Sequence, residues 1–95
     1  MIETPTQKRR RRRETLYKLP LVLEPQPEGG YTVTCPLLPE LITEGDTARA
    51  AMDNVADALA ALLEAYKALG KVVPAVLRPG AKNSPLWLEA VVAVA

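Results

Sequence analysis

Residues 45–70, GDTARAAMDNVADALAALLEAYKALG, predict one long amphipathic helix. Asp46 or Thr47 can cap its start, because either side chain can accept a hydrogen bond from a backbone N–H of the first turn. Over residues 48–69 apolar side chains recur at steps of three and four, which places them on one side of the helix. Gly70 then stands where helices often end in a left-handed residue. The apolar stripe consists of Ala48, Ala51, Met52, Val55, Leu59, Leu62, Leu63, Tyr66 and Leu69.

The predicted helix is longer than the strands it would cover. At 1.5 Å per residue it spans about 33 Å, whereas a strand of six residues spans about 20 Å. We therefore expect the helix to cross the whole sheet, and its overhanging end is a candidate contact surface.

The chain before the helix predicts a β-hairpin. Its first strand is the apolar stretch 16–24. Pro20 in this stretch has no backbone N–H, so it requires an edge position, a bulge, or an orientation in which the missing donor points away from a neighbouring strand. Residues 28–30, Glu-Gly-Gly, supply the turn because glycine readily adopts a positive φ. Residues 31–35, rich in β-branched and aromatic side chains, predict the second strand.

Alternate side chains of the second strand face opposite sides of the sheet, so Tyr31, Val33 and Cys35 should face the core. We expect Cys35 to be a small buried apolar side chain rather than a nucleophile. Residues 36–39, Pro-Leu-Leu-Pro, make a stiff connection to a short third strand at residues 40–44. The two leucines of this connection either fold back on the core, which we favour, or are exposed to a partner.

The chain after the helix predicts an irregular connection followed by a fourth strand. Residues 72–84 contain two prolines, a glycine and an asparagine, whereas Leu86–Ala95 has high strand preference and one charge. A strand with so little polar protection should pair with the first sheet or with a partner chain. Together the elements predict an α+β domain of βββαβ order: a three-stranded antiparallel sheet, plus the C-terminal strand, packed by one long amphipathic helix.

Charge is unevenly distributed along the chain. The chain has 12 Lys and Arg against 11 Asp and Glu, and without one basic run the balance becomes six against eleven, a net charge of −5. Because like charges repel within a Debye length, we expect residues 1–14 to be a disordered basic arm and residues 15–95 to be the folded domain. The arm either contacts nucleic-acid phosphates or only aids solubility. The basic run consists of Lys8, Arg9, Arg10, Arg11, Arg12 and Arg13.

The composition argues against most enzymatic chemistry. The chain has no histidine and one cysteine, which removes the usual general base, the usual zinc ligand and an internal disulfide. We expect no catalytic residues, metal or cofactor. A ribonuclease-like metal site would have to use Glu40, Glu44, Asp46 or Asp53, but solvated surface charges explain these carboxylates more simply. Without a candidate membrane span or secretory signal, we expect a cytoplasmic protein.

The middle of the chain, about residues 19–74, resembles the HicB-type antitoxin domain of bacterial and archaeal toxin–antitoxin pairs. The resemblance rests on the order of several short motifs before and in the long helix. They are Glu-Gly-Gly-Tyr-Thr-Val at 28–33, Pro-Leu-Leu-Pro-Glu-Leu at 36–41, Thr-Glu-Gly-Asp-Thr at 43–47, the helix residues Leu59, Leu62, Leu63 and Tyr66, and the closing residues 70–74.

The resemblance implies a partial ribonuclease-H-like fold of ββαβ or βββαβ order, without ribonuclease activity, because a fold does not by itself give a function. It also implies a protein that binds a small RNA-cleaving toxin of the HicA type and covers the toxin's active surface. The net charge of −5 that remains without the basic run suits a basic RNA-binding partner.

The sequence thus favours an antitoxin-type binding module that is not an enzyme and that forms a homodimer or larger oligomer. The alternative is an accessory nucleic-acid-binding protein, whose arm contacts DNA or RNA while the folded domain dimerises. The candidate residues for contact with a protein partner are Glu28, Tyr31, Leu37, Leu38 and Glu40.

Overall fold

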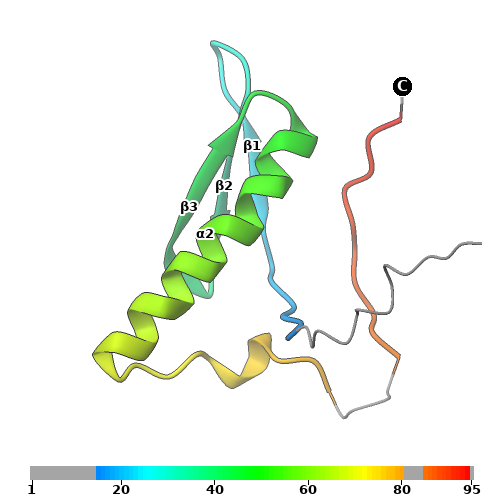
Figure 1. The fold of residues 1–95 in the computed structure, drawn as a ribbon. Coiled ribbons are helices and arrows are strands. Elements are labelled where there is room, and N and C mark those ends of the chain that lie inside the picture. Colours follow the sequence, from blue (N-terminus) through cyan, green and yellow to red (C-terminus); the bar gives the residue numbers. More distant parts are fainter. Residues whose placement is uncertain (1–14, 81–84, 95) are drawn as a thin grey trace, which may run out of the picture.

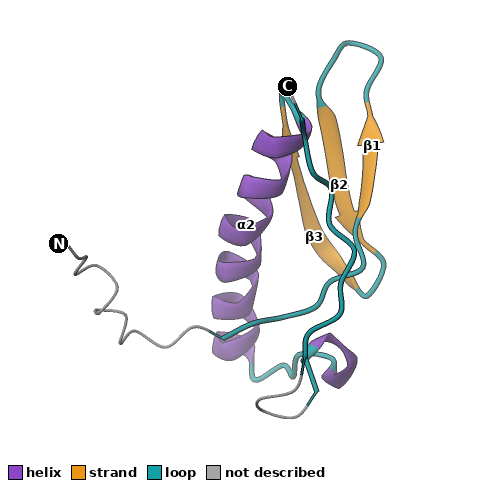
Figure 2. Ribbon diagram, turned by 90° about the vertical axis from the view of Figure 1, so that its right-hand side faces the viewer, coloured by secondary structure: helices purple, strands orange, loops and turns teal. Residues whose placement is uncertain are grey.

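The computed structural model describes residues 15–80 and 85–94. Strands β1 (Val22–Pro25), β2 (Tyr31–Cys35) and β3 (Leu38–Gly45) form an antiparallel sheet in the order β1-β2-β3, and helix α2 (Ala48–Leu69) follows. Figure 1 and Figure 2 show α2 on one face of the sheet and, within the described ranges, no helix or strand on the other face. The expected α+β class, with one long helix on a three-stranded antiparallel sheet, is confirmed.

Two glycines make the turn between β1 and β2. Gly29 and Gly30 have φ angles of +103° and +82°, a region that side chains with a Cβ rarely adopt. The Gln26 N–H donates a hydrogen bond to the Gly30 carbonyl over 2.9 Å. The predicted hairpin therefore forms where the glycines stand, and its second strand covers the predicted residues.

The register of the strands determines which side chains face the helix. Val33, at the centre of β2, pairs with Leu23 of β1 and Thr43 of β3, and it is fully buried. A register shift at the end of β2 then places Cys35 opposite Leu38, and both side chains are buried. Cys35 is thus a buried side chain, as expected, and β3 begins two residues earlier than predicted.

Helix α2 has the predicted bounds because both of its ends are capped. The Thr47 hydroxyl accepts a hydrogen bond from the Ala50 N–H over 3.0 Å, so Thr47 is the N-cap. Gly70 has a φ of +70°, and its N–H donates to the Lys67 carbonyl over 3.2 Å. The Lys71 N–H donates to the Tyr66 carbonyl over 2.8 Å. These two bonds satisfy carbonyls of the last turn and end the helix in a Schellman motif.

The hydrophobic core lies between α2 and the sheet. One of its residues comes from the connection predicted to be irregular: a 3₁₀ helix at Ala75–Leu77 buries Leu77 completely. The Lys18 N–H donates to the Leu77 carbonyl over 2.7 Å, which joins this connection to the segment before β1. The buried apolar side chains are Val33, Cys35, Leu38, Leu41, Ala51, Val55, Tyr66 and Leu77.

The first strand is shorter than predicted. Pairing of β1 with β2 runs only from Val22 opposite Thr34 to Pro25 opposite Tyr31, because β2 is only five residues long. Residues 16–21 therefore lie outside the ladder, although Tyr17, Leu19 and Leu21 still pack against the core.

The predicted strand at Leu86–Ala95 is wrong for the part that the structure describes, because residues 85–94 form neither helix nor strand. A strand needs a neighbour with free backbone donors and acceptors. Figure 1 shows this segment on the β1 side of the molecule, where the strand is only four residues long. Pro20 and Pro25 also lack an N–H, so this edge offers few hydrogen bonds to a fourth strand.

The apolar stripe of α2 reaches the core only in part. Leu69 is 74% exposed, because the last turn of α2 extends past the end of the sheet, as Figure 1 shows. The predicted overhang is therefore present.

Candidate functional site

The five residues predicted to contact a partner do not form one surface. Glu28 is exposed in the turn between β1 and β2, whereas Leu37 is exposed in the turn at the opposite end of β2. Tyr31 is half-buried and packs against the core. Leu38 folds back on the core, the alternative favoured from the sequence, since its register opposite Cys35 places it on the core side with 1% of its surface exposed. It therefore offers almost no surface to a partner.

The fifth residue, Glu40, belongs to a polar cluster with Tyr66 and Lys71 that links β3 to the end of α2. The Tyr66 hydroxyl donates a hydrogen bond to Glu40 Oε1 over 3.0 Å. Lys71 Nζ lies 3.1 Å from Glu40 Oε2 and 4.5 Å from the centre of the Tyr66 ring. Glu40 thus has two partners in its own chain, which indicates a structural contribution.

The three groups of this cluster shift one another's pKa. Three hydrogen bonds hold the pKa of the Glu40 carboxyl below its ordinary value. The largest effect comes from the backbone of Glu40 itself, and smaller effects come from Lys71 and Tyr66. The hydrogen bond to Glu40 raises the pKa of the Lys71 ammonium. Burial, and then the same carboxylate, raise the pKa of the Tyr66 hydroxyl. Near neutral pH the cluster therefore holds a carboxylate, an ammonium and a neutral phenol, with no group poised to exchange a proton.

Replacing Glu40 with glutamine is expected to lower the melting temperature at pH 7. A carboxyl whose folded pKa is depressed stabilises the fold above its unfolded pKa, and the stabilisation disappears as pH falls through the folded pKa. The difference between wild type and Glu40→Gln should therefore shrink and then vanish as the pH falls through the depressed pKa of Glu40. Thermal melting between pH 7 and pH 2 measures it, with Glu64→Gln on α2 as the control for loss of an exposed carboxylate. A difference that is unchanged at low pH would contradict the ionic contribution.

The face of the sheet opposite α2 is a second candidate, which we call the open face. Side chains paired across antiparallel strands share one face. Val22, Thr34 and Ile42 form one row, and Glu24, Thr32 and Glu44 form the next. Val22 is 44% exposed and Ile42 is 63% exposed. The open face thus carries an apolar row beside a row that ends in two carboxylates.

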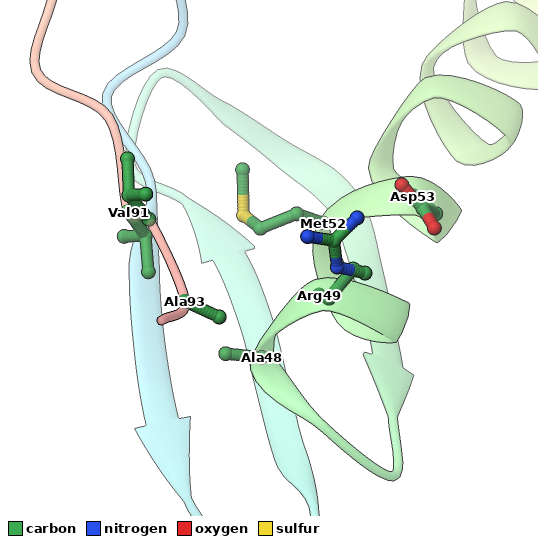
Figure 3. Close-up of a pocket in the computed structure, with 7 residues that line it drawn as sticks. Ala48, Arg49, Met52, Asp53, Val91 and Ala93 are labelled. Carbon is green, nitrogen blue, oxygen red and sulfur yellow. The ribbon is translucent and has the colours of Figure 1, made fainter. Parts of the chain in front are cut away.

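A shallow pocket of about 250 Å³ lies between the first turns of α2 and residues 91–93. Figure 3 shows Ala48 and Met52 on the helix side, with Val91 and Ala93 on the C-terminal segment. Apart from the charged side chains of Arg49 and Asp53, its lining is apolar. The lining contains no nucleophile, so the pocket offers no catalytic constellation.

Metal binding and membrane insertion find no support in the parts of the chain that the structure describes. Within residues 15–80 and 85–94, no three His, Cys, Asp or Glu side chains gather closely enough to hold a metal ion. In the same ranges no helix combines the length and the apolar character needed to cross a bilayer. The predicted phosphate-binding residues of the basic arm, Lys8 to Arg13, lie outside the described residues.

Curated proteins of several bacteria are similar to this chain. Antitoxin HicB 1 of Photorhabdus laumondii is 45% identical over 49 residues, and Antitoxin HicB of Escherichia coli K12 is 37% identical over 57 residues. A UPF0150 protein of Synechocystis is 32% identical over 59 residues, which cover 62% of this chain and 75% of that protein. The chain belongs to the HicB-type antitoxin family. A scan against protein-family models gave no match.

The match covers different shares of the HicB-type proteins. The aligned residues are 52% of this chain and 32% of the Photorhabdus antitoxin, and 60% of this chain and 41% of the Escherichia coli antitoxin. This HicB-type chain therefore spans about a third to two fifths of the length of these two antitoxins.

Sequence reasoning missed the open face of this HicB-type domain. For β1 the sequence does hold a signal. Every second residue from 17 to 23 is a large apolar side chain, and all four of them pack against the core, so Val22 between them faces the other side. In β3, Leu41 and Ile42 are adjacent and both apolar, so the sequence does not choose between them. Only the pairing of Ile42 with Thr34 places Ile42 on the open face.

Proposed function

We propose that this chain is an antitoxin-type binding module that neutralises a small RNA-cleaving toxin of the HicA type by covering the toxin's active surface. The observation that carries the proposal is the similarity to two proteins named Antitoxin HicB, at 45% and 37% identity. Neutralisation here requires binding and no chemistry, which is compatible with a buried Cys35 and a polar cluster without a group poised for proton transfer.

Electrostatics supports a basic partner. The described residues include five basic and nine acidic side chains, a net charge of −4. A protein that cleaves RNA must attract phosphates and therefore presents positive charge. An acidic domain meets such a surface faster than a neutral one and competes with the phosphates for the same contacts.

The test begins with the adjoining reading frame: if it encodes a small basic protein, the two proteins are co-expressed and RNA cleavage by the purified candidate toxin is measured with and without this chain. We expect a stable complex, and at an equimolar ratio this chain should reduce cleavage at least about tenfold, because a Kd near 1 nM leaves little free toxin at micromolar concentration. A toxin that cuts RNA equally well with and without this chain would contradict the proposal.

A matched variant separates this proposal from the nucleic-acid alternative. Replacement of Arg9, Arg10, Arg11, Arg12 and Arg13 by glutamine removes five positive charges and leaves the described domain unchanged. If neutralisation is a property of the domain, this variant should silence the toxin as well as wild type does. Loss of silencing together with loss of RNA binding would instead favour action through the arm.

A further inference from the structure

Nothing in the described chain packs on the open face of the sheet. α2 packs on the other face, and residues 85–94 lie on the β1 side rather than over the open face, as Figure 1 and Figure 2 show. A sheet with one face packed and one face in water usually alternates apolar and polar residues, with the polar ones outside. Val22 and Ile42 break this rule, since both are large apolar residues on the outside.

The row of Val22, Thr34 and Ile42 crosses all three strands, with Thr34 in the middle. Because neighbouring strands lie about 4.8 Å apart, the two outer residues of this row are about 10 Å apart. Three β-branched side chains at this spacing make a flat and rigid patch whose burial costs little side-chain entropy.

Charge distinguishes the strands and their turns from the rest of the molecule. Residues 19–48, which include all three strands, contain five acidic side chains and no basic one. Within residues 15–80 and 85–94 there is one salt bridge, which pairs Glu40 with Lys71. The other four carboxylates lie toward the hairpin end of the sheet, and two of them belong to the open face. The four are Glu24, Glu28, Glu44 and Asp46.

We infer that the open face is the surface on which this chain docks a basic protein partner, with Val22 and Ile42 in the centre and Glu24 and Glu44 at the rim. This inference rests on the proposed function and assigns the surface that performs it. An apolar centre with a polar rim is the usual anatomy of a protein interface. Acidic rim residues pair with the positive charges that an RNA-binding surface must carry.

A second copy of this chain fits the open face less well than a basic partner does. A second copy would bring its own Glu24 and Glu44 into the same interface, and like charges placed together cost several kcal/mol. The carboxylates that help a basic partner to bind thus disfavour self-association through this face.

The test compares two double charge reversals in the full-length chain. Glu24→Lys with Glu44→Lys reverses the rim of the open face, whereas Asp57→Lys with Glu64→Lys makes the same charge change on the solvent side of α2. All four side chains are exposed, so both variants should fold, and circular dichroism checks this. Toxin affinity is measured by calorimetry, and association rates are measured at several salt concentrations.

We expect the open-face reversal to weaken toxin binding about 100-fold, to flatten the salt dependence of the association rate and to restore RNA cleavage. The α2 reversal should weaken binding less than about fivefold, since only long-range attraction changes. Ile42→Ala should weaken binding about tenfold while keeping the net charge, which tests the apolar centre independently.

Four results would overturn the assignment. Equal losses for the two charge reversals would show that only net charge matters. If neither the open-face reversal nor Ile42→Ala changes toxin affinity, but wild type still stops RNA cleavage, the toxin binds elsewhere on the chain. In that case the proposed function stands. A dimer that becomes a monomer on Ile42→Ala, with toxin affinity intact, would assign the face to a second copy. Wild type that neither binds nor silences the toxin would contradict the proposed function and the assignment together.

Discussion

Replacing Gly45 with alanine is expected to lower the free energy of unfolding by about 3 kcal/mol and the melting temperature by about 10–20 °C. Gly45 is the last residue of β3, directly against the first turn of α2. A Cβ at this position would lie 2.6 Å from the Ala51 Cα and 2.7 Å from the Ala50 carbonyl carbon. Carbon atoms in contact normally stay at about 3.5–4.0 Å.

The atoms that such a Cβ would meet belong to the helix backbone, which cannot rotate away as a side chain would. α2 would have to move off the sheet, and this movement would loosen the packing of Ala51, which is fully buried. Gly80→Ala is the matched control, because a Cβ there would meet nothing within 4 Å. It should change the free energy of unfolding by less than about 0.5 kcal/mol. Urea and thermal unfolding measure both variants, and equal stability of Gly45→Ala and wild type would contradict this close approach.

Replacing Leu41 with alanine is expected to cost about 2–5 kcal/mol of the free energy of unfolding. Leu41 lies in β3 with 1% of its surface exposed, among the largest fully buried side chains of the core. Its truncation removes buried methyl groups and leaves a cavity between β3 and α2. A domain of this length has about 5–10 kcal/mol in total, so one substitution removes a large share of the stability.

The neighbouring residue provides the control for Leu41. Ile42 is 63% exposed on the open face, and Ile42→Ala should cost less than about 1 kcal/mol, mainly through lower strand preference. Denaturant unfolding of the two variants compares them directly. Similar losses at both positions would mean that the register between β2 and β3 does not separate them as described.

The helix and the hairpin could be predicted because their signals are local. Thr47 and Gly70 cap α2 through backbone groups three to five residues away, so the bounds of the helix are encoded beside it. Gly29 and Gly30 likewise make the turn through their own φ angles. Neither element needs a distant part of the chain to specify where it begins and ends.

Other features depended on residues far apart in the chain. Gly45 stands just before the helix cap in the sequence, but its main constraint is the approach of the helix backbone. Leu77 was predicted to lie in an irregular connection, yet it is fully buried and its carbonyl accepts a hydrogen bond from Lys18. The absent C-terminal strand has the same origin, because strand preference produces no strand without a hydrogen-bonded neighbour.

In the candidate site, too, some features follow from local sequence and others from contacts between distant residues. The sequence alone determined the hairpin, the long helix, their order and the acidic character of residues 19–48, since these depend on local conformation and residue type. The tertiary structure alone decided which member of each apolar pair is buried: Leu38 and Leu41 lie in the core, whereas Leu37 and Ile42 lie at the surface. Adjacent apolar residues are equally suited to burial, and only the register with β2 assigns one of them to the helix side and the other to water.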